Sequence, residues 1–102
     1  MIEAEIYKAL GDPIRLEIVK RLSTKPSSTI GELSLNLGVS RQGARKQLQV
    51  LVDANVVYLT QHGRETLVTL DTKTLEIARS FIAQLERHWD ARLDALKKFT
   101  ET

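Results

Sequence analysis

The run from Arg41 to Gln49, RQGARKQLQ, holds the side chains of this sequence best suited to chemistry with another molecule. It carries the cations Arg41, Arg45 and Lys46 and no acidic residue. Guanidinium and ammonium groups bind phosphate oxygens, and glutamine amides hydrogen-bond the edges of bases in the major groove. The residue types therefore indicate contact with double-stranded DNA.

This run has the pattern of an amphipathic helix. Apolar residues recur at the i, i+4, i+7 and i+8 positions of one face, namely Ala44, Leu48, Leu51 and Val52. The opposite face is polar and carries Gln42, Gly43, Lys46 and Gln49, with Arg45 and Gln47 on its flanks and Arg41 in its first turn. A helix packed in this way leaves its polar side free to enter a major groove.

A shorter apolar stripe precedes this helix and has helical spacing at Ile30, Leu33 and Leu37. Gly38-Val39-Ser40 separates the two stripes. We expect a helix over 30–37 that Gly38 ends, followed by a helix that Ser40 caps and that runs to about Asn55. The segment 29–55 is thus predicted to be a helix-turn-helix.

Three residues of this segment depart from the simple pattern. Gly43 lies inside the second helix, where glycine costs about 1 kcal/mol relative to alanine. It is either a tolerated weakness or a point of close approach to DNA or to the preceding helix. Leu35 and Val50 fall off the apolar stripes, and we expect neighbouring loops or a hairpin to cover them.

Two helices are predicted before the helix-turn-helix. The first covers 2–10, and Gly11-Asp12-Pro13 ends it. Asp12 is a good N-cap and Pro13 suits the first position of a second helix, in which Ile14, Ile18, Val19 and Leu22 form the buried stripe. The segment 23–28 is expected to be a loop, and Thr29 with Glu32 matches a capping box.

A β-hairpin is predicted directly after the helix-turn-helix, within 56–71. The segments 56–60 and 66–70 are rich in β-branched residues, and the loop 61–65 between them contains His62-Gly63-Arg64. Arg64 at the hairpin tip is a candidate for contact with a phosphate or with the minor groove.

The last predicted element is a long helix over 72–99, with an apolar stripe too extensive for a small domain that already has a core. Pairing with a second copy would cover this stripe and would present two reading helices to a two-part DNA site. The predicted interface residues lie on the first and last helices: Ile2, Ile6, Leu75, Ala78, Ile82, Leu85, Trp89 and Leu93.

Composition limits the other possibilities. The 102 residues are enough for one domain, and the net charge is only +2. From Lys20 to Arg64, however, the sequence contains seven basic residues and two acidic ones. The middle of the chain is therefore basic, and its two ends together are acidic. No cysteine and no long apolar run occur, and the N-terminus carries acids where a signal peptide has bases, so we expect a cytoplasmic protein.

Catalysis has little support in the sequence. We find no nucleophile elbow, no phosphate-binding loop and no paired carboxylates that suggest a pocket. Asp90 and Asp94 lie one helical turn apart among basic residues, where ion pairs account for them. We therefore expect no catalytic site and no cofactor.

The order of these elements, α-α-α-α-β-β-α, resembles that of the ArsR/SmtB-type winged helix-turn-helix transcriptional repressors. The resemblance is carried by three blocks, ALGDPIRLEIVKRL, TIGELSLNLGVSRQGARKQLQVLVDANVV and HGRETLVTL, and with the flanking helices it covers nearly the whole chain. It implies a mainly α-helical domain over 1–102 with a small β-hairpin as the wing, dimeric through its first and last helices.

The resemblance also implies a function. Members of this family are homodimeric repressors that bind an operator, and we expect a palindromic one here. The reading-helix positions of the family fall on Ser40, Arg41, Gln42, Arg45, Lys46 and Gln47, and the wing-tip positions fall on Arg64 and His62. The family often has small hydroxyl residues and a histidine in the reading helix, whereas this chain has Gly43 and Ala44 there, so the operator sequence is expected to differ.

The larger departure from the family concerns the residues that sense a metal. Many members bind a metal through cysteines of the third helix, and this chain has none. Others use several histidines and acids between the last helices, whereas the last helix here offers only His88 beside Glu86 and Asp90. We therefore predict no metal site. We expect Trp89 to pack into the dimer, as it does in family members that lack a metal site.

Two alternatives stay open. One is a winged helix used for contact with proteins, without DNA binding. The other is a repressor that senses a metal or a small molecule between its last helices. The basic, acid-free reading helix favours DNA binding over the first of these.

Overall fold

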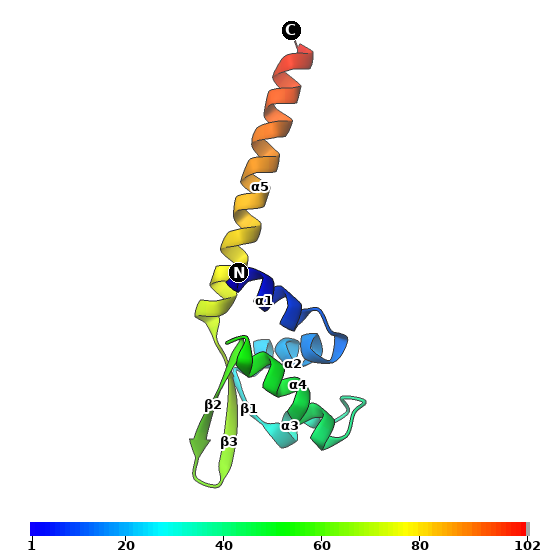
Figure 1. Cartoon of the computed structure of the whole chain (residues 1–102), viewed down its shortest axis with the longest axis vertical. Coiled ribbons are helices and arrows are strands. Elements are labelled where there is room, and N and C mark those ends of the chain that lie inside the picture. The colour runs from blue at the N-terminus through cyan, green and yellow to red at the C-terminus, as the bar shows by residue number, and fades with distance from the viewer. Residues whose placement is uncertain (102) are drawn as a thin grey trace.

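The computed structural model describes residues 1–101 and is mainly helical with a small antiparallel sheet, as predicted (Figure 1). Its elements, in chain order, are α1 (Ile2–Leu10), α2 (Pro13–Thr24), β1 (Ser27–Thr29), α3 (Ile30–Ser34), α4 (Arg41–Asp53), β2 (Val57–His62), β3 (Glu65–Leu70) and α5 (Thr72–Glu101). Helices α1 to α4 and the sheet form a body, and α5 extends away from it as a rod (Figure 1).

The sheet has three strands in the order β1-β3-β2, one more than predicted. Strand β1 covers the last two residues of the predicted loop and the predicted cap Thr29, and it pairs with β3 from Ser27 opposite Thr69 to Thr29 opposite Leu67. The hydroxyls of Ser27 and Thr69 are 2.9 Å apart, and Ser28 is buried. A strand of three small hydroxyl residues has no apolar alternation, so only its pairing with β3 identifies it.

The hairpin itself is tighter than predicted. Strands β2 and β3 pair from Val57 opposite Leu70 to His62 opposite Glu65, so the connection is Gly63-Arg64 and the predicted loop 61–65 is wrong at both ends. Gly63 has a φ of 65°, a left-handed conformation that glycine adopts without steric cost. This short turn fixes Arg64 at the tip of the hairpin.

The hydrophobic core joins α1, α2, α3, α4, the sheet and the first turns of α5. Its most completely buried side chains come from nearly all of these elements: Ile6, Ile18, Leu22, Leu51, Val56, Val57 and Val68. Burial of a side chain of this size stabilises the fold by roughly 1.5–3 kcal/mol. Ala44 and Leu48 are also buried, which confirms the predicted inner face of α4.

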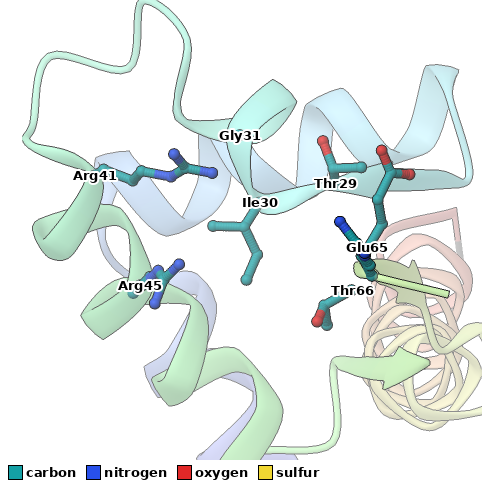
Figure 2. Close-up of a pocket in the computed structure, with 8 residues that line it drawn as sticks. Thr29, Ile30, Gly31, Arg41, Arg45, Glu65 and Thr66 are labelled. Atoms are coloured by element: carbon teal, nitrogen blue, oxygen red, sulfur yellow. The ribbon is translucent and has the colours of Figure 1, made fainter. Parts of the chain in front are cut away.

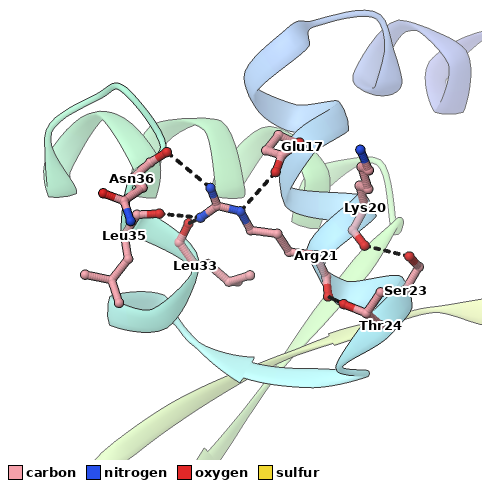
Figure 3. Close-up of polar contacts among 8 residues, drawn as sticks. All are labelled: Glu17, Lys20, Arg21, Ser23, Thr24, Leu33, Leu35 and Asn36. Atoms are coloured by element: carbon pink, nitrogen blue, oxygen red, sulfur yellow. Dashed lines mark hydrogen bonds and ion pairs between the residues drawn. The ribbon is translucent and has the colours of Figure 1, made fainter.

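Helix α3 ends at Ser34, three residues before the predicted end at residue 37. The reason is a side chain from α2, Arg21, which donates hydrogen bonds to the carbonyls of Leu33, Leu35 and Asn36 at 2.9, 2.5 and 3.2 Å (Figure 3). Because Arg21 already donates to these carbonyls, they do not need the backbone N–H donors of a further helical turn. Leu37 is still buried, so its predicted burial is correct although it is not helical.

The predicted caps are confirmed. The Asp12 carboxylate accepts hydrogen bonds from the N–H groups of Ile14 and Arg15, and Thr29 forms a capping box with Glu32. The Ser40 hydroxyl accepts from the Gly43 N–H at 3.0 Å at the start of α4. The beginnings of three helices are thus set by local sequence.

Gly43 is crowded by the turn before α4. A β-carbon at this position would lie 3.2 Å from the Ser40 hydroxyl oxygen and 3.4 Å from the β-carbon of Val39. Within the protein the close approach is therefore to this turn and not to α3. The expected cover of Leu35 and Val50 is wrong, because both side chains are exposed.

Helix α5 contacts the body only through its first turns. The Tyr7 hydroxyl on α1 donates a hydrogen bond to the Ala78 carbonyl at 2.5 Å, and the rings of Tyr7 and Phe81 lie 6.0 Å apart. The helix then continues to Glu101, past the predicted end at residue 99, and gives the molecule dimensions of 68 × 25 × 25 Å. No helix within residues 1–101 is both long and apolar enough to span a bilayer.

Candidate nucleic-acid interface

Helix α4 presents a polar face to solvent. Arg41, Gln42, Arg45 and Lys46 are exposed, while Ala44 and Leu48 on the inner side are buried. The helix therefore has a packed back that holds it rigidly and an open front that carries three cations and an amide. This is the arrangement that reading of a major groove requires.

A cleft of about 250 Å³ separates α4 from the hairpin (Figure 2). Its lining comes from the start of α3, the first turns of α4 and the start of β3: Thr29, Ile30, Gly31, Arg41, Arg45, Arg64, Glu65 and Thr66. The cleft brings the arginines of α4 and of the hairpin tip together, although Arg45 and Arg64 are 19 positions apart in the sequence. Sequence reasoning assigned these arginines to two separate motifs.

The guanidinium groups of Arg41, Arg45 and Arg64 have no hydrogen-bond or ion-pair partner among the residues that the structure describes. Arg15 and Arg21, in contrast, are each held by several protein acceptors. Three unpaired arginines around one cleft repel each other and attract an anion. Glu65 is the acid of the lining and offsets only part of this charge.

A second, open depression of about 460 Å³ lies on the α4 surface and is lined by Arg41, Gln42 and Arg45. Arg41 and Arg45 thus border both hollows, whereas Gln42 borders only the second. An amide that shares a hollow with two guanidinium groups combines a donor and an acceptor for a base edge with cations for the flanking phosphates.

The other predicted DNA-binding residues lie elsewhere. Ser40 is exposed, but its hydroxyl caps α4. His62 is exposed at the end of β2 and is not part of the cleft lining. Gln47 is only partly exposed, and its Oε1 accepts a hydrogen bond from Arg15 Nη1 at 2.7 Å. Gln47 therefore faces α2, and its amide oxygen is already used by the protein.

Sequence reasoning missed the part of the cleft that lies outside α4 and the hairpin tip. Ile30 and Gly31 line it from α3, and a β-carbon on Gly31 would lie 3.4 Å from Arg41 Nη2. A glycine in the first turn of a helix is an available signal for such a close approach, because it is otherwise unfavourable there. Gln49, assigned to the open face, donates a hydrogen bond to Asp53 at 2.8 Å.

Within the described part of the chain, no three histidine, aspartate or glutamate side chains are grouped so that they could hold a metal ion. His88 lies on the exposed part of α5. The arrangement around α4 can bind an extended polyanion by hydrogen bonds and charge.

Comparison with known proteins identifies relatives of the whole domain. A family model described as "Helix-turn-helix domain" matches residues 10–59. The chain is 34% identical over 87 residues to the HTH-type transcriptional regulator Rv2034 of Mycobacterium tuberculosis. This alignment covers 85% of this chain and 78% of that protein. The match includes both α4 and most of the elements that pack against it.

Solved structures give the same result for the fold. The ArsR-like transcriptional regulator from Rhodococcus sp. RHA1 superposes with a TM-score of 0.82 and 28% identity, over 96% of this chain and 92% of that one. The homodimeric winged helix-turn-helix DNA-binding domain of Mb0332 from Mycobacterium bovis has a TM-score of 0.65 over 86% of this chain and 82% of that one. At 18% identity, the second likeness concerns the fold alone.

Proposed function

This chain belongs to the ArsR-like winged helix-turn-helix transcriptional regulators, and we propose that it is a homodimeric repressor that binds a palindromic operator. DNA-binding regulation of transcription is the function of the family. The dimer, the operator symmetry and the roles of individual residues are our proposal. The observation that carries it is the set of unpaired arginines around the cleft between α4 and the hairpin.

In this proposal the exposed face of α4 enters the major groove. Gln42 and Arg45 are the side chains best placed to hydrogen-bond base edges, because both border the open depression on α4. Arg41 and Lys46 bind the phosphates on either side of the groove. Ser40 acts mainly through α4 itself, because its cap fixes where the helix begins.

The hairpin tip binds the DNA backbone or the adjacent minor groove through Arg64. Ile30 and Thr66 line the same cleft as Arg45 and Arg64. A phosphate held there would contact cations from both elements, so the hairpin and the reading helix would bind as one unit. His62 lies beside this tip and outside the cleft.

The apolar surface of α5 supports the dimer. Ile82, Leu85, Trp89 and Leu93 remain exposed on the single chain, as does Ile2 on α1. Ile6 and Ala78, two other predicted interface residues, are 0% and 6% exposed and belong to the core of the single chain. Leu75 also packs against that core. The proposed interface therefore uses the outer part of α5 with Ile2.

The proposal is tested by selecting bound sequences from random DNA and then titrating the selected site. We expect a two-part symmetric sequence, and we expect Gln42→Ala or Arg45→Ala to weaken its binding by about 1–3 kcal/mol. Circular dichroism of the variants serves as the control for folding. Recovery of no preferred sequence, with no effect of either substitution, would favour the alternative of a protein-contact module.

A further inference from the structure

The cleft between α4 and the hairpin carries more positive charge than one phosphate of a DNA strand can neutralise. Its lining holds three cations, Arg41, Arg45 and Arg64, and one acid, Glu65, which leaves two positive charges in excess. Within residues 1–101, no ion pair joins Glu65 to any of these arginines. A phosphodiester of DNA has a single negative charge, so the cleft is better matched to an anion with two.

We propose that this cleft also binds a small free phosphomonoester, and that the bound anion competes with DNA for the same arginines. A phosphomonoester carries about −1.5 to −2 charges at pH 7, which matches the excess charge of the cleft. The competition rests on the proposed function, and the inference adds to it a class of ligand and a way in which that ligand releases the DNA.

The hydrogen-bond donors left in the cleft are mainly those of the arginines. The Thr29 hydroxyl donates to Glu32 Oε1 at 3.1 Å, and the Thr66 hydroxyl donates to Gln61 Oε1 at 3.0 Å, so both hydroxyls are already used within the protein. Each guanidinium, in contrast, offers five N–H donors in a planar arrangement that fits the oxygens of a phosphate. The chemistry of the cleft therefore selects an anion over a neutral ligand.

Gly31 keeps the α3 side of the cleft open. A β-carbon at this position would lie 3.4 Å from Arg41 Nη2 and 3.9 Å from the Thr29 hydroxyl oxygen. Figure 2 shows the Arg41 side chain extended from α4 toward Gly31. Glycine is unfavourable within a helix, but it allows a ligand to come close to the backbone. An anion can therefore reach the Arg41 guanidinium where a side chain on residue 31 would otherwise stand.

The volume of the cleft limits the size of the ligand. It is about 250 Å³, below the roughly 300–1,000 Å³ of sites that hold a drug-sized molecule. Ile30 is the large apolar residue of the lining and can pack against a short organic group. A phosphate that carries such a group fits this description better than a whole nucleotide.

Occupation of the cleft would remove Arg45 and Arg64 from the DNA interface together. An anion that binds there cannot be present at the same time as a backbone phosphate, since both need the same guanidinium groups. Simple competition multiplies the apparent Kd for the operator by one plus the ratio of anion concentration to its own Kd. At ten times that Kd, operator binding weakens about elevenfold for each cleft that must be free.

An NMR titration of the amide signals tests the anion site without DNA. Methyl phosphate, a monoester, and dimethyl phosphate, a diester, are added to the full chain, with sodium chloride adjusted to keep the ionic strength constant. We expect the signals of Gly31 and Thr66 to shift until they saturate. Methyl phosphate should bind at least about fivefold more tightly than dimethyl phosphate, because it carries the second charge.

The matched variants are Arg64→Gln in the cleft and Arg87→Gln on α5, which remove the same charge at two places. Arg64→Gln should weaken methyl phosphate binding at least about fivefold, and Arg87→Gln should change it less than about twofold. The anion site would be overturned by equal weakening in both variants, or by signals of Gly31 that never saturate.

Operator titrations with and without methyl phosphate, at the same ionic strength, test the competition. We expect the apparent Kd to rise about elevenfold at ten times the Kd of the anion. An unchanged operator affinity while methyl phosphate occupies the cleft would overturn the competition and leave the proposed function intact. Saturable binding of methyl phosphate by a chain that binds no DNA sequence would overturn the proposed function and the competition, and it would support the anion site alone.

Discussion

A hydrogen bond between Arg15 and Gln47 connects α2 to α4. Arg15 Nη1 donates a hydrogen bond to Gln47 Oε1 at 2.7 Å, and Arg15 Nε donates another to the Ala9 carbonyl at 2.6 Å. One guanidinium therefore joins α2 to the last turn of α1 and to the middle of α4. Since α1 is also bonded to α5 through Tyr7, these hydrogen bonds link α4 to the long helix through α2 and α1.

Replacement of Arg15 by leucine is expected to reduce the free energy of unfolding by about 1–3 kcal/mol. The substitution leaves the Ala9 carbonyl and the Gln47 amide without their donor in a partly buried place. Urea denaturation of the variant measures the change. Lys20→Leu, at an exposed position of the same helix, is the control and should change stability by less than about 0.5 kcal/mol.

A double-mutant cycle of Arg15→Leu with Gln47→Ala separates a structural role of Gln47 from a DNA-reading role. We expect a coupling energy of about 0.5–3 kcal/mol in unfolding, because the two side chains share a hydrogen bond. Gln47→Ala alone should not change which bases the operator requires. Altered base preference in that variant would show that Gln47 turns toward the DNA when the complex forms.

Arg21→Met is expected to loosen the turn before α4. The guanidinium satisfies the carbonyls of Leu33, Leu35 and Asn36, and its loss leaves three acceptors at the end of a five-residue helix. We expect a loss of about 1–3 kcal/mol in stability and faster hydrogen exchange of the amides at 33–40. Equal exchange in the variant and the parent chain would mean that solvent replaces Arg21 without cost.

Local sequence predicted most helix beginnings and the buried face of α4. Asp12, Thr29 and Ser40 each act on backbone groups two or three residues away, so their roles can be inferred from neighbouring positions alone. The early end of α3 could not be predicted in this way. It depends on Arg21, which lies 12 residues before the first carbonyl that it binds.

The candidate site could likewise be predicted only in part from local sequence. Arg45 and Arg64 were predicted singly from residue type and motif, but their shared cleft depends on how the hairpin folds back beside α3. Strand β1 takes part in that arrangement and had no sequence signal beyond three hydroxyl residues. The hydrogen bond of Gln47 to Arg15 could not be predicted from local sequence, because Arg15 lies 32 positions away on another helix.

Arg45→Gln and Arg64→Gln are each expected to reduce the salt dependence of DNA binding. An arginine that neutralises one phosphate contributes about −0.9 to the slope of log K against log salt. Anisotropy titrations of the selected operator between about 50 and 200 mM salt measure this slope. Arg87→Gln on α5 is the control and should leave the slope unchanged. An unchanged slope for Arg64→Gln would place the hairpin tip outside the interface.

Glu65→Gln is expected to have the opposite effect and to tighten DNA binding severalfold. Glu65 lines the cleft with Arg41, Arg45 and Arg64 and repels any phosphate that enters it. The same titration with operator and with unrelated DNA measures the change, which should be similar for both because a charge in the cleft reads no base. Weaker binding by the variant would instead indicate that Glu65 positions one of the arginines.

The capping box of α3 is expected to make stability depend on pH in the acidic range. A hydrogen bond from Lys25, and a second from the backbone N–H of Thr29, hold the pKa of the Glu32 carboxyl below its ordinary value of 4.5. The unfolded chain then takes up this proton more readily than the folded chain, so the contribution of Glu32 to the free energy of unfolding is fully present above pH 4.5 and is lost as the pH falls through the folded pKa.

Glu32→Gln keeps an oxygen acceptor for the cap and removes the charge. We expect the difference in unfolding free energy between the parent chain and Glu32→Gln to be constant from pH 7 to 5 and to shrink below pH 4.5. A difference that persists to pH 3 would mean that the cap stabilises α3 by geometry alone.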